Sequence, residues 1–93
     1  MKEAGCEYTK RVTIVNELGL HARSAARIAQ IAQGARSRVW IKKGDEIVDA
    51  SEVIDILTLA CGKGTAITLK IEDLTDKKIL DRIVALVEMG FRE

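Results

Sequence analysis

The hydrophobic pattern of this chain changes period several times, and the order of those changes restricts the folds it can adopt. Stretches in which every second residue is apolar are typical of strands, whereas apolar residues three and four positions apart are typical of helices. The 93 residues read in order as strand, helix, strand, strand, helix, strand, helix. The predicted elements cover residues 8–15, 22–33, 36–42, 46–49, 51–59, 65–71 and 75–89.

This order of elements matches two split β-α-β units, in which right-handed crossovers bring all the helices to one face of the sheet. We therefore predict an α/β (α+β) fold of the order βαββαβα. It would be an open-faced β-sandwich, with a four-stranded antiparallel sheet and three helices on one face. A chain this short buries one core, so residues 1–93 are expected to form a single domain, with residues 1–7 as a loosely ordered N-terminal extension.

Alanines form the apolar face of the first predicted helix. They recur at the spacing that lines one side of a helix, and their small side chains would let that helix approach the sheet closely. Gly34 is expected to end the helix. The stripe predicted to face the sheet comprises Ala22, Ala25, Ala26, Ala29 and Ala32.

The ends of the other two helices are marked by polar residues and by a glycine. Ser51 is expected to be the N-cap of the helix over residues 51–59. Thr75 or Asp76 is expected to cap the last helix, and Gly90 to end it.

The short helix over residues 51–59 carries more apolar residues than one buried stripe holds. Some of them would stay exposed and offer a surface to a partner protein. In the alternative, all of them reach the core, and the sequence does not distinguish the two possibilities. The residues are Val53, Ile54, Ile56, Leu57 and Leu59.

Charge is distributed unevenly, although the net charge is only +1. Residues 1–44 contain nine Lys and Arg against three Asp and Glu, and residues 45–93 contain six against eleven. The basic half either attracts an acidic protein partner by long-range electrostatics or is simply a solvated surface. Three aromatic residues in all argue against a stacking platform for bases, so we expect no nucleic-acid partner. In the alternative, disfavoured interpretation, nucleic acid would bind to basic side chains, namely those of Arg23, Arg27, Arg36, Arg38 and Lys42.

Composition and cysteine spacing disfavour several other classes of protein. No apolar run approaches the ~20 residues that cross a bilayer, and the N-terminal residues lack the apolar segment of a signal peptide. Cys6 and Cys61 stand outside any paired motif, and together with one histidine they do not make a zinc site. We expect a cytoplasmic monomer that binds no membrane, no metal and no cofactor.

The only histidine lies where the first predicted strand passes into the first predicted helix. His21 would stand at a helix N-terminus, whose unpaired backbone N–H groups and dipole attract anions. A nucleophilic imidazole beside an anion site suits a phosphoryl carrier. The alternative from spacing alone is a histidine that packs or caps the helix.

Residues 19–23, GLHAR, together with this order of elements, resemble the HPr family. These proteins are the histidine-containing phosphocarriers of the phosphoenolpyruvate-dependent phosphotransferase system. The resemblance runs from about residue 10 to the C-terminus, and residues 16–21 and 85–91 are most similar to the nitrogen-related NPr branch. The other matching segments are residues 12–14, 48–54, 62–64 and 90–91.

The resemblance implies a stoichiometric phosphoryl carrier rather than a stand-alone enzyme. His21 would accept a phosphoryl group from phospho-enzyme I and donate it to an enzyme IIA, in sugar transport or in a nitrogen-type branch. Arg23 would balance the phosphate charge. The amides of Ala22 and Arg23, with the amide and hydroxyl of Ser24, would face the phosphate oxygens. The partners would dock on Val53, Ile54 and Leu57.

Three residues depart from the family pattern. Ser24 replaces the usual proline at the helix start, which is expected to retune transfer rather than abolish it. Glu52 occupies the position of the regulatory serine and is not phosphorylatable, so we expect that regulation to be absent. Leu18 replaces a small polar residue near the phosphate. These departures leave a second function open, an HPr-like regulatory binding module that acts on partner proteins without efficient phosphotransfer.

Overall fold

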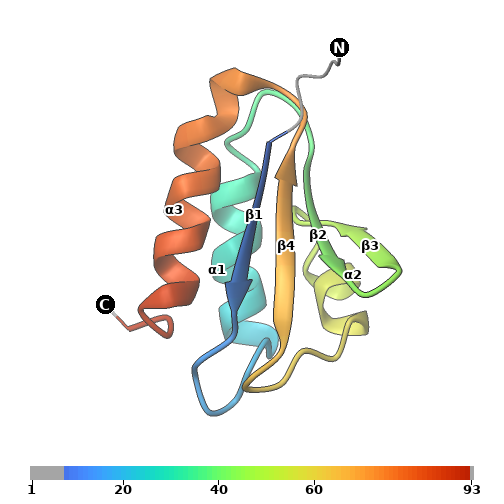
Figure 1. The fold of residues 1–93 in the computed structure, drawn as a ribbon, viewed down its shortest axis with the longest axis vertical. Helices are drawn as coiled ribbons and strands as arrows, with labels where there is room; N and C mark the ends of the chain where they lie inside the picture. Colours follow the sequence, from blue (N-terminus) through green and yellow to red (C-terminus); the bar gives the residue numbers. More distant parts are fainter. Residues whose placement is uncertain (1–7, 93) are drawn as a thin grey trace.

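Figure 1 shows the computed structural model, which describes residues 8–92. The order of its elements confirms the predicted βαββαβα arrangement and adds a single 3₁₀ turn, η1, before the last helix. The predicted extension over residues 1–7 lies outside the described residues, and so does Cys6. The elements are β1 (Tyr8–Thr13), α1 (Ala22–Ala32), β2 (Val39–Lys43), β3 (Glu46–Asp49), α2 (Val53–Thr58), β4 (Ala66–Ile71), η1 (Leu74–Asp76) and α3 (Lys77–Glu88).

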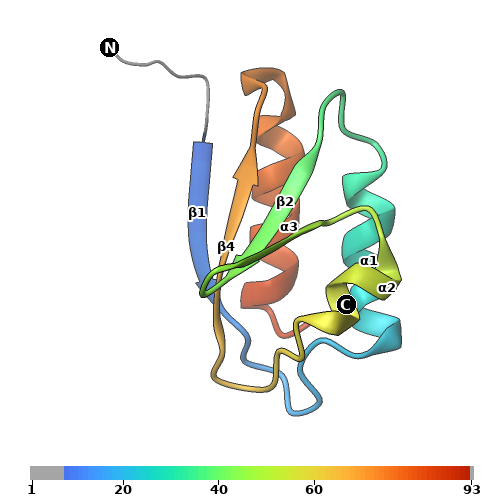
Figure 2. The same ribbon diagram turned by 90° about the vertical axis from the view of Figure 1, so that its right-hand side faces the viewer.

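The four strands form one antiparallel sheet in the order β1-β4-β2-β3. Val12 of β1 is paired with Ile67 of β4, and Leu69 of β4 is paired with Ile41 of β2. In Figure 2 the helices lie on one side of the sheet and the other face is open. Helix α3 contacts β1 and β4, whereas the short α2 contacts α1 and β3. The predicted open-faced sandwich is therefore confirmed.

The core lies between the sheet and the two long helices. Alternation along β4 buries Ile67, Leu69 and Ile71, as the sequence predicts. Ile28 from α1 and Ile83 from α3 belong to the same buried cluster and have no exposed surface. Burying one such side chain contributes about 1.5–3 kcal/mol to the free energy of folding. This layer therefore fixes the position of α1 on the sheet.

The buried face of α1 differs in part from the alanine stripe that the sequence predicts. Ala25, Ala29 and Ala32 are buried, but Ala22 and Ala26 are exposed. The bulky side chain of Ile28 lies at the centre of the buried face, which also includes Ser24. Because the helix turns about 100° per residue, Ala22 and Ala26 lie roughly 120° and 160° around the helix axis from Ile28 and therefore fall outside that face.

A buried carboxylate explains why β2 begins at Val39 rather than at the predicted residue 36. Asp76 is only 1% exposed, and its two oxygens accept the backbone N–H groups of Arg36 at 2.7 Å and Ser37 at 2.9 Å. These two residues are thereby held in the loop between α1 and β2. Asp76 stands at the N-cap position of α3, as one of the two predicted caps, but its side chain makes no capping bond there.

We predict that Asp76→Ala lowers the free energy of unfolding by about 2–4 kcal/mol, because two backbone N–H groups lose a buried, charged acceptor. Urea unfolding followed by circular dichroism measures this difference. The matched control is Asp81→Ala, which removes an exposed carboxylate paired with Lys77 at 3.0 Å and should change the same free energy by less than about 1 kcal/mol. Equal effects of the two substitutions would contradict the role given to Asp76.

Candidate functional site

His21 occupies the N-cap of α1. Its backbone is extended, with φ −111° and ψ −177°, and its carbonyl accepts the first helical hydrogen bond, from the N–H of Ala25 at 2.8 Å. The N–H groups of Ala22 and Arg23 follow in the first turn, where helix geometry supplies no intrahelical acceptor. The structure therefore places the imidazole at the end of the helix that attracts anions.

Ser24 organises the loop around His21 from inside the fold. The side chain is buried, and its Oγ accepts the N–H of His21 at 3.0 Å. The same hydroxyl lies 3.0 Å from the carbonyl oxygen of Gly19 and 3.2 Å from that of His21, so that it can donate to either. The hydroxyl that the sequence suggests for phosphate is thus engaged in the loop, and it takes over the ordering role of the usual proline.

Two loops meet directly beneath the histidine. The N–H of Leu20 donates to the carbonyl of Cys61 at 2.8 Å, and Gly19 has φ +64°. A Cβ added at Gly19 would lie 2.3 Å from the Cys61 oxygen and 2.7 Å from Cα of Gly62. Asn16 closes the turn from the other side, because its Nδ2 donates to the Gly19 carbonyl at 2.9 Å. Only glycine fits this contact, which determines where His21 sits.

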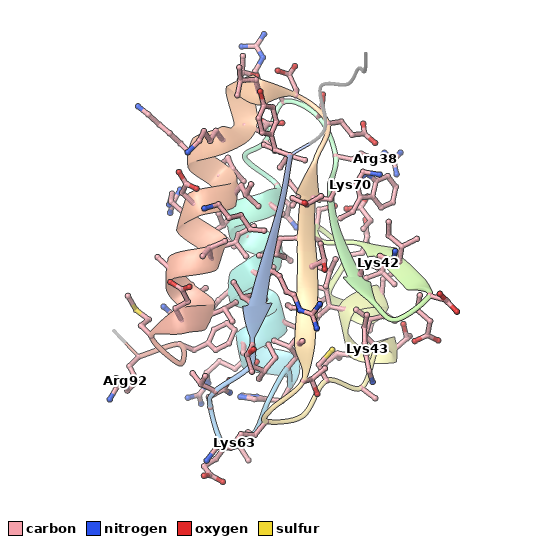
Figure 3. The ribbon with its side chains drawn as sticks, in the orientation of Figure 1. Arg38, Lys42, Lys43, Lys63, Lys70 and Arg92 are labelled. Atoms are coloured by element: carbon pink, nitrogen blue, oxygen red, sulfur yellow. The ribbon has the colours of Figure 1, made fainter. Side chains whose placement is uncertain are left out.

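A cleft of about 640 Å³ lies beside this loop. Leu18 at its edge is 74% exposed and therefore presents an apolar surface next to the histidine. Glu17 is paired with Lys63 at 2.7 Å, and the hydrogen bond and charge of that lysine lower the pKa of Glu17. Figure 3 shows Lys63 at the lower end of the molecule. The cleft is lined by Asn16, Glu17, Leu18, His21, Ala22, Arg23, Ser24, Arg27, Gly90 and Phe91.

The far wall of the cleft comes from the C-terminal end of the chain, which the sequence analysis did not connect with the site. Arg27 Nη1 donates to the carbonyl oxygen of Phe91 at 2.6 Å, across 64 positions of sequence. The available signal was the spacing of Arg23 and Arg27, four residues apart on a predicted helix, which places both on one side of it. The structure brings both arginines to the cleft that contains His21.

The predicted docking residues of α2 divide between core and solvent. Ile54 is 71% exposed, whereas Val53 and Leu57 are half-buried against the core cluster. Ile56 and Leu59 are fully buried. The sequence left open whether some apolar residues of this helix stay exposed or all reach the core. The structure supports the first possibility in part, because the side chain of Ile54 is exposed to solvent.

Ser51 does not cap α2, contrary to the prediction. The N-cap is Glu52, which is exposed and makes no capping hydrogen bond with its side chain. The Ser51 hydroxyl and N–H both donate to Asp49 Oδ1, at 2.7 and 2.8 Å. Burial raises the pKa of Asp49, but these bonds and the Arg38 guanidinium at 3.2 Å outweigh it, so that the pKa lies below its ordinary value. The acidic partner draws Ser51 into the preceding turn.

The basic residues considered for nucleic acid do not form one surface. Arg38 and Lys42 lie along β2 in Figure 3, whereas Arg23 and Arg27 line the cleft at the start of α1. Among residues 8–92, no helix is long and apolar enough to cross a membrane.

Comparison with known proteins identifies the class to which this arrangement belongs. Residues 8–89 match the family model described as the PTS HPr component phosphorylation site. The phosphocarrier protein HPr of Cupriavidus necator is 35% identical over 81 residues, which cover 87% of this chain and 91% of that protein. The phosphocarrier protein NPr of Shewanella violacea is 38% identical over 84 residues, covering 90% and 92%.

The fold leads to the same class. The crystal structure of a phosphocarrier protein HPr from Bacillus anthracis superposes with a TM-score of 0.83 at 31% identity, covering 89% of this chain and 99% of that one. The chain belongs to the HPr family of phosphocarriers of the phosphotransferase system.

We predict that Gly19→Ala destabilises the fold by about 2–4 kcal/mol, since it adds left-handed backbone strain and a steric overlap with the Cys61 carbonyl. Gly44→Ala is the matched control, because Gly44 has φ +59° but no atom within 4 Å of an added Cβ. It should cost only the conformational part, about 1–2 kcal/mol. Thermal and urea unfolding measure both variants, and a Gly19→Ala protein no less stable than Gly44→Ala would refute the close contact.

Proposed function

We propose that His21 carries a phosphoryl group between two partner proteins. A lone pair of the imidazole, on Nδ1, attacks the phosphorus held by phospho-enzyme I. The bond from phosphorus to the donor atom then breaks, and its electron pair stays on the donor. The same exchange runs in the second step, with His21 as donor and an enzyme IIA as acceptor. The observation that carries the proposal is the position of His21 at the N-cap of α1, beside the cleft.

The first turn of α1 supplies the surroundings that a phosphorylated histidine requires. The amides of Ala22, Arg23 and Ser24 belong to this turn, and the guanidinium of Arg23 borders the same cleft. The field of a helix end stabilises an anion by about 0.3–1 kcal/mol, up to ~2 kcal/mol where it is partly buried. A contribution of this size favours the phosphoryl group without trapping it, which suits a carrier that must pass it on.

We assign partner docking to the apolar residues near the site. Ile54 stands out from α2, and Leu18 is exposed at the edge of the cleft. Exposed side chains of this kind are the anchors that fill pockets on a partner. Val53 and Leu57 support Ile54 from below, since they are half-buried against the core. The partners are enzyme I and an enzyme IIA of the sugar or nitrogen-type branch.

We predict that phosphoenolpyruvate and a cognate enzyme I add one phosphoryl group, about 80 Da, that is acid-labile and alkali-stable, as expected of a phosphohistidine. Intact-mass spectrometry measures the adduct. His21→Ala should abolish it, while His21→Ala and the unaltered chain keep the same unfolding curve. An unaltered chain that takes up no phosphoryl group would favour the regulatory binding module over the carrier.

We further predict that an HPr kinase with ATP leaves this chain unlabelled. Glu52 has no hydroxyl, and the neighbouring Ser51 hydroxyl is bound to Asp49 at 2.7 Å. Glu52→Ser restores an acceptor at the regulatory position and should become labelled under the same conditions, as measured by phosphopeptide mapping. Stoichiometric label on Ser51 of the unaltered chain would overturn this assignment.

A further inference from the structure

A row of side chains crosses all four strands on the face of the sheet that the helices leave open. Residues directly opposite each other on neighbouring strands point to the same face. The pairing aligns Arg11 on β1, Thr68 on β4, Lys42 on β2 and Ile47 on β3. Ile67, the chain neighbour of Thr68, is buried on the helix side, so this row faces away from the helices in Figure 2. We call it the open-face row.

The neighbouring part of the same face is closed by its own contacts. Trp40 Nε1 donates to Glu72 Oε2 at 2.8 Å. The guanidinium carbon of Arg38 lies 5.8 Å from the centre of the Trp40 ring, and its Nη1 lies 3.2 Å from Asp49 Oδ2. Charged and aromatic groups in this part of the face therefore have partners within the face itself.

The open-face row lacks such partners. Within residues 8–92, the side chains of Arg11 and Lys42 are exposed and form no ion pair or hydrogen bond. Both stand next to Thr68, one on each side, so that their backbones are roughly 10 Å apart, which is two strand spacings. Ile47 continues the row and is 48% exposed. The row thus presents two cations and one large apolar side chain to solvent.

A groove of about 720 Å³ runs over the open-face row. Arg11 and Lys42 line it together with one carboxylate, that of Asp45 in the turn between β2 and β3. Lys70 lines it as well, but it has an interaction of its own and is left out of this comparison. Among the described residues, none lines both this groove and the cleft that contains His21.

The composition of the open-face row fits an acidic protein segment better than a nucleic acid. Arginine and apolar side chains are typical of protein interfaces, and complementary charge guides the encounter of the partners. Single-stranded nucleic acid is bound by stacking on a series of aromatic rings. The aromatic residue nearby on β2, Trp40, is already engaged by Arg38 and Glu72.

We propose that the open-face row is a docking surface for an acidic segment of a second protein. Carboxylates of that segment pair with Arg11 and Lys42, and an apolar side chain packs on Ile47. Because the groove and the His21 cleft have separate linings, a partner held here leaves the histidine accessible. The inference does not depend on phosphoryl transfer.

Titration with a short peptide of glutamates around a central leucine tests the proposal, followed by proton–nitrogen NMR of the full chain. The amides of Thr68 and Ile47 should show the largest shifts. We expect Arg11→Gln and Lys42→Gln each to weaken peptide binding about threefold, and the double variant about tenfold. Lys78→Gln is the matched control, because it removes an exposed charge from α3 and should leave binding unchanged.

Several results would overturn the proposal. These are no response to the peptide, equal loss of binding in Lys42→Gln and Lys78→Gln, or shifts concentrated around His21. Tighter binding of single-stranded oligothymidylate than of the peptide would assign the surface to nucleic acid instead, and self-association through this face in sedimentation would assign it to a second copy of the chain. If a glutamine variant fails to fold, the unaltered chain must still show the predicted shifts and lose the peptide as salt is raised.

The outcome is separable from that of the carrier function. A chain that takes up no phosphoryl group on His21 but binds the peptide through Arg11 and Lys42 would refute the carrier and leave the docking surface intact. A chain that is phosphorylated normally and ignores the peptide would do the reverse.

Discussion

The hydrogen bond from the N–H of Leu20 to the carbonyl of Cys61, 2.8 Å long, is the contact on which the site depends. It joins the loop before α1 to the loop before β4, and the approach is so close that Gly19 admits no side chain. Because β4 is held between β1 and β2 in the sheet, this contact transmits the rigidity of the sheet to the histidine. A reactive group on a loop thereby acquires a fixed position relative to the helix end.

The replacement of proline by Ser24 shows how a different residue achieves similar order. Proline at a helix start fixes φ and gives up an N–H that has no helical partner. Ser24 instead keeps its amide and binds the loop through its side chain, with contacts to His21 and Gly19. Local hydrogen bonds of this type commonly organise helix starts. The phosphate site therefore retains one more backbone donor than a proline would leave.

Periodicity predicted the sheet and the helices well, because alternation on β4 and the spacing of apolar residues on α3 report directly on burial. It also placed His21 at the junction where the structure has it. Two of the errors share a cause, which is a carboxylate that captures residues assigned by the sequence pattern to the start of a strand or a helix. Asp76 shortens β2 by capturing Arg36 and Ser37, and Asp49 removes Ser51 from the end of α2. Likewise, no local pattern links Arg27 to Phe91 across 64 positions.

The central claim is that a phosphoryl group on His21 rests against the opening amides of α1, and proton–nitrogen NMR of the chain before and after charging by enzyme I and phosphoenolpyruvate tests it most directly. The account predicts that the amide protons of Ala22 and Arg23 show the largest downfield shifts, because they gain a charged acceptor. If those amides stay in place while resonances elsewhere in the chain move, the phosphoryl group is bound at another position and the account is contradicted.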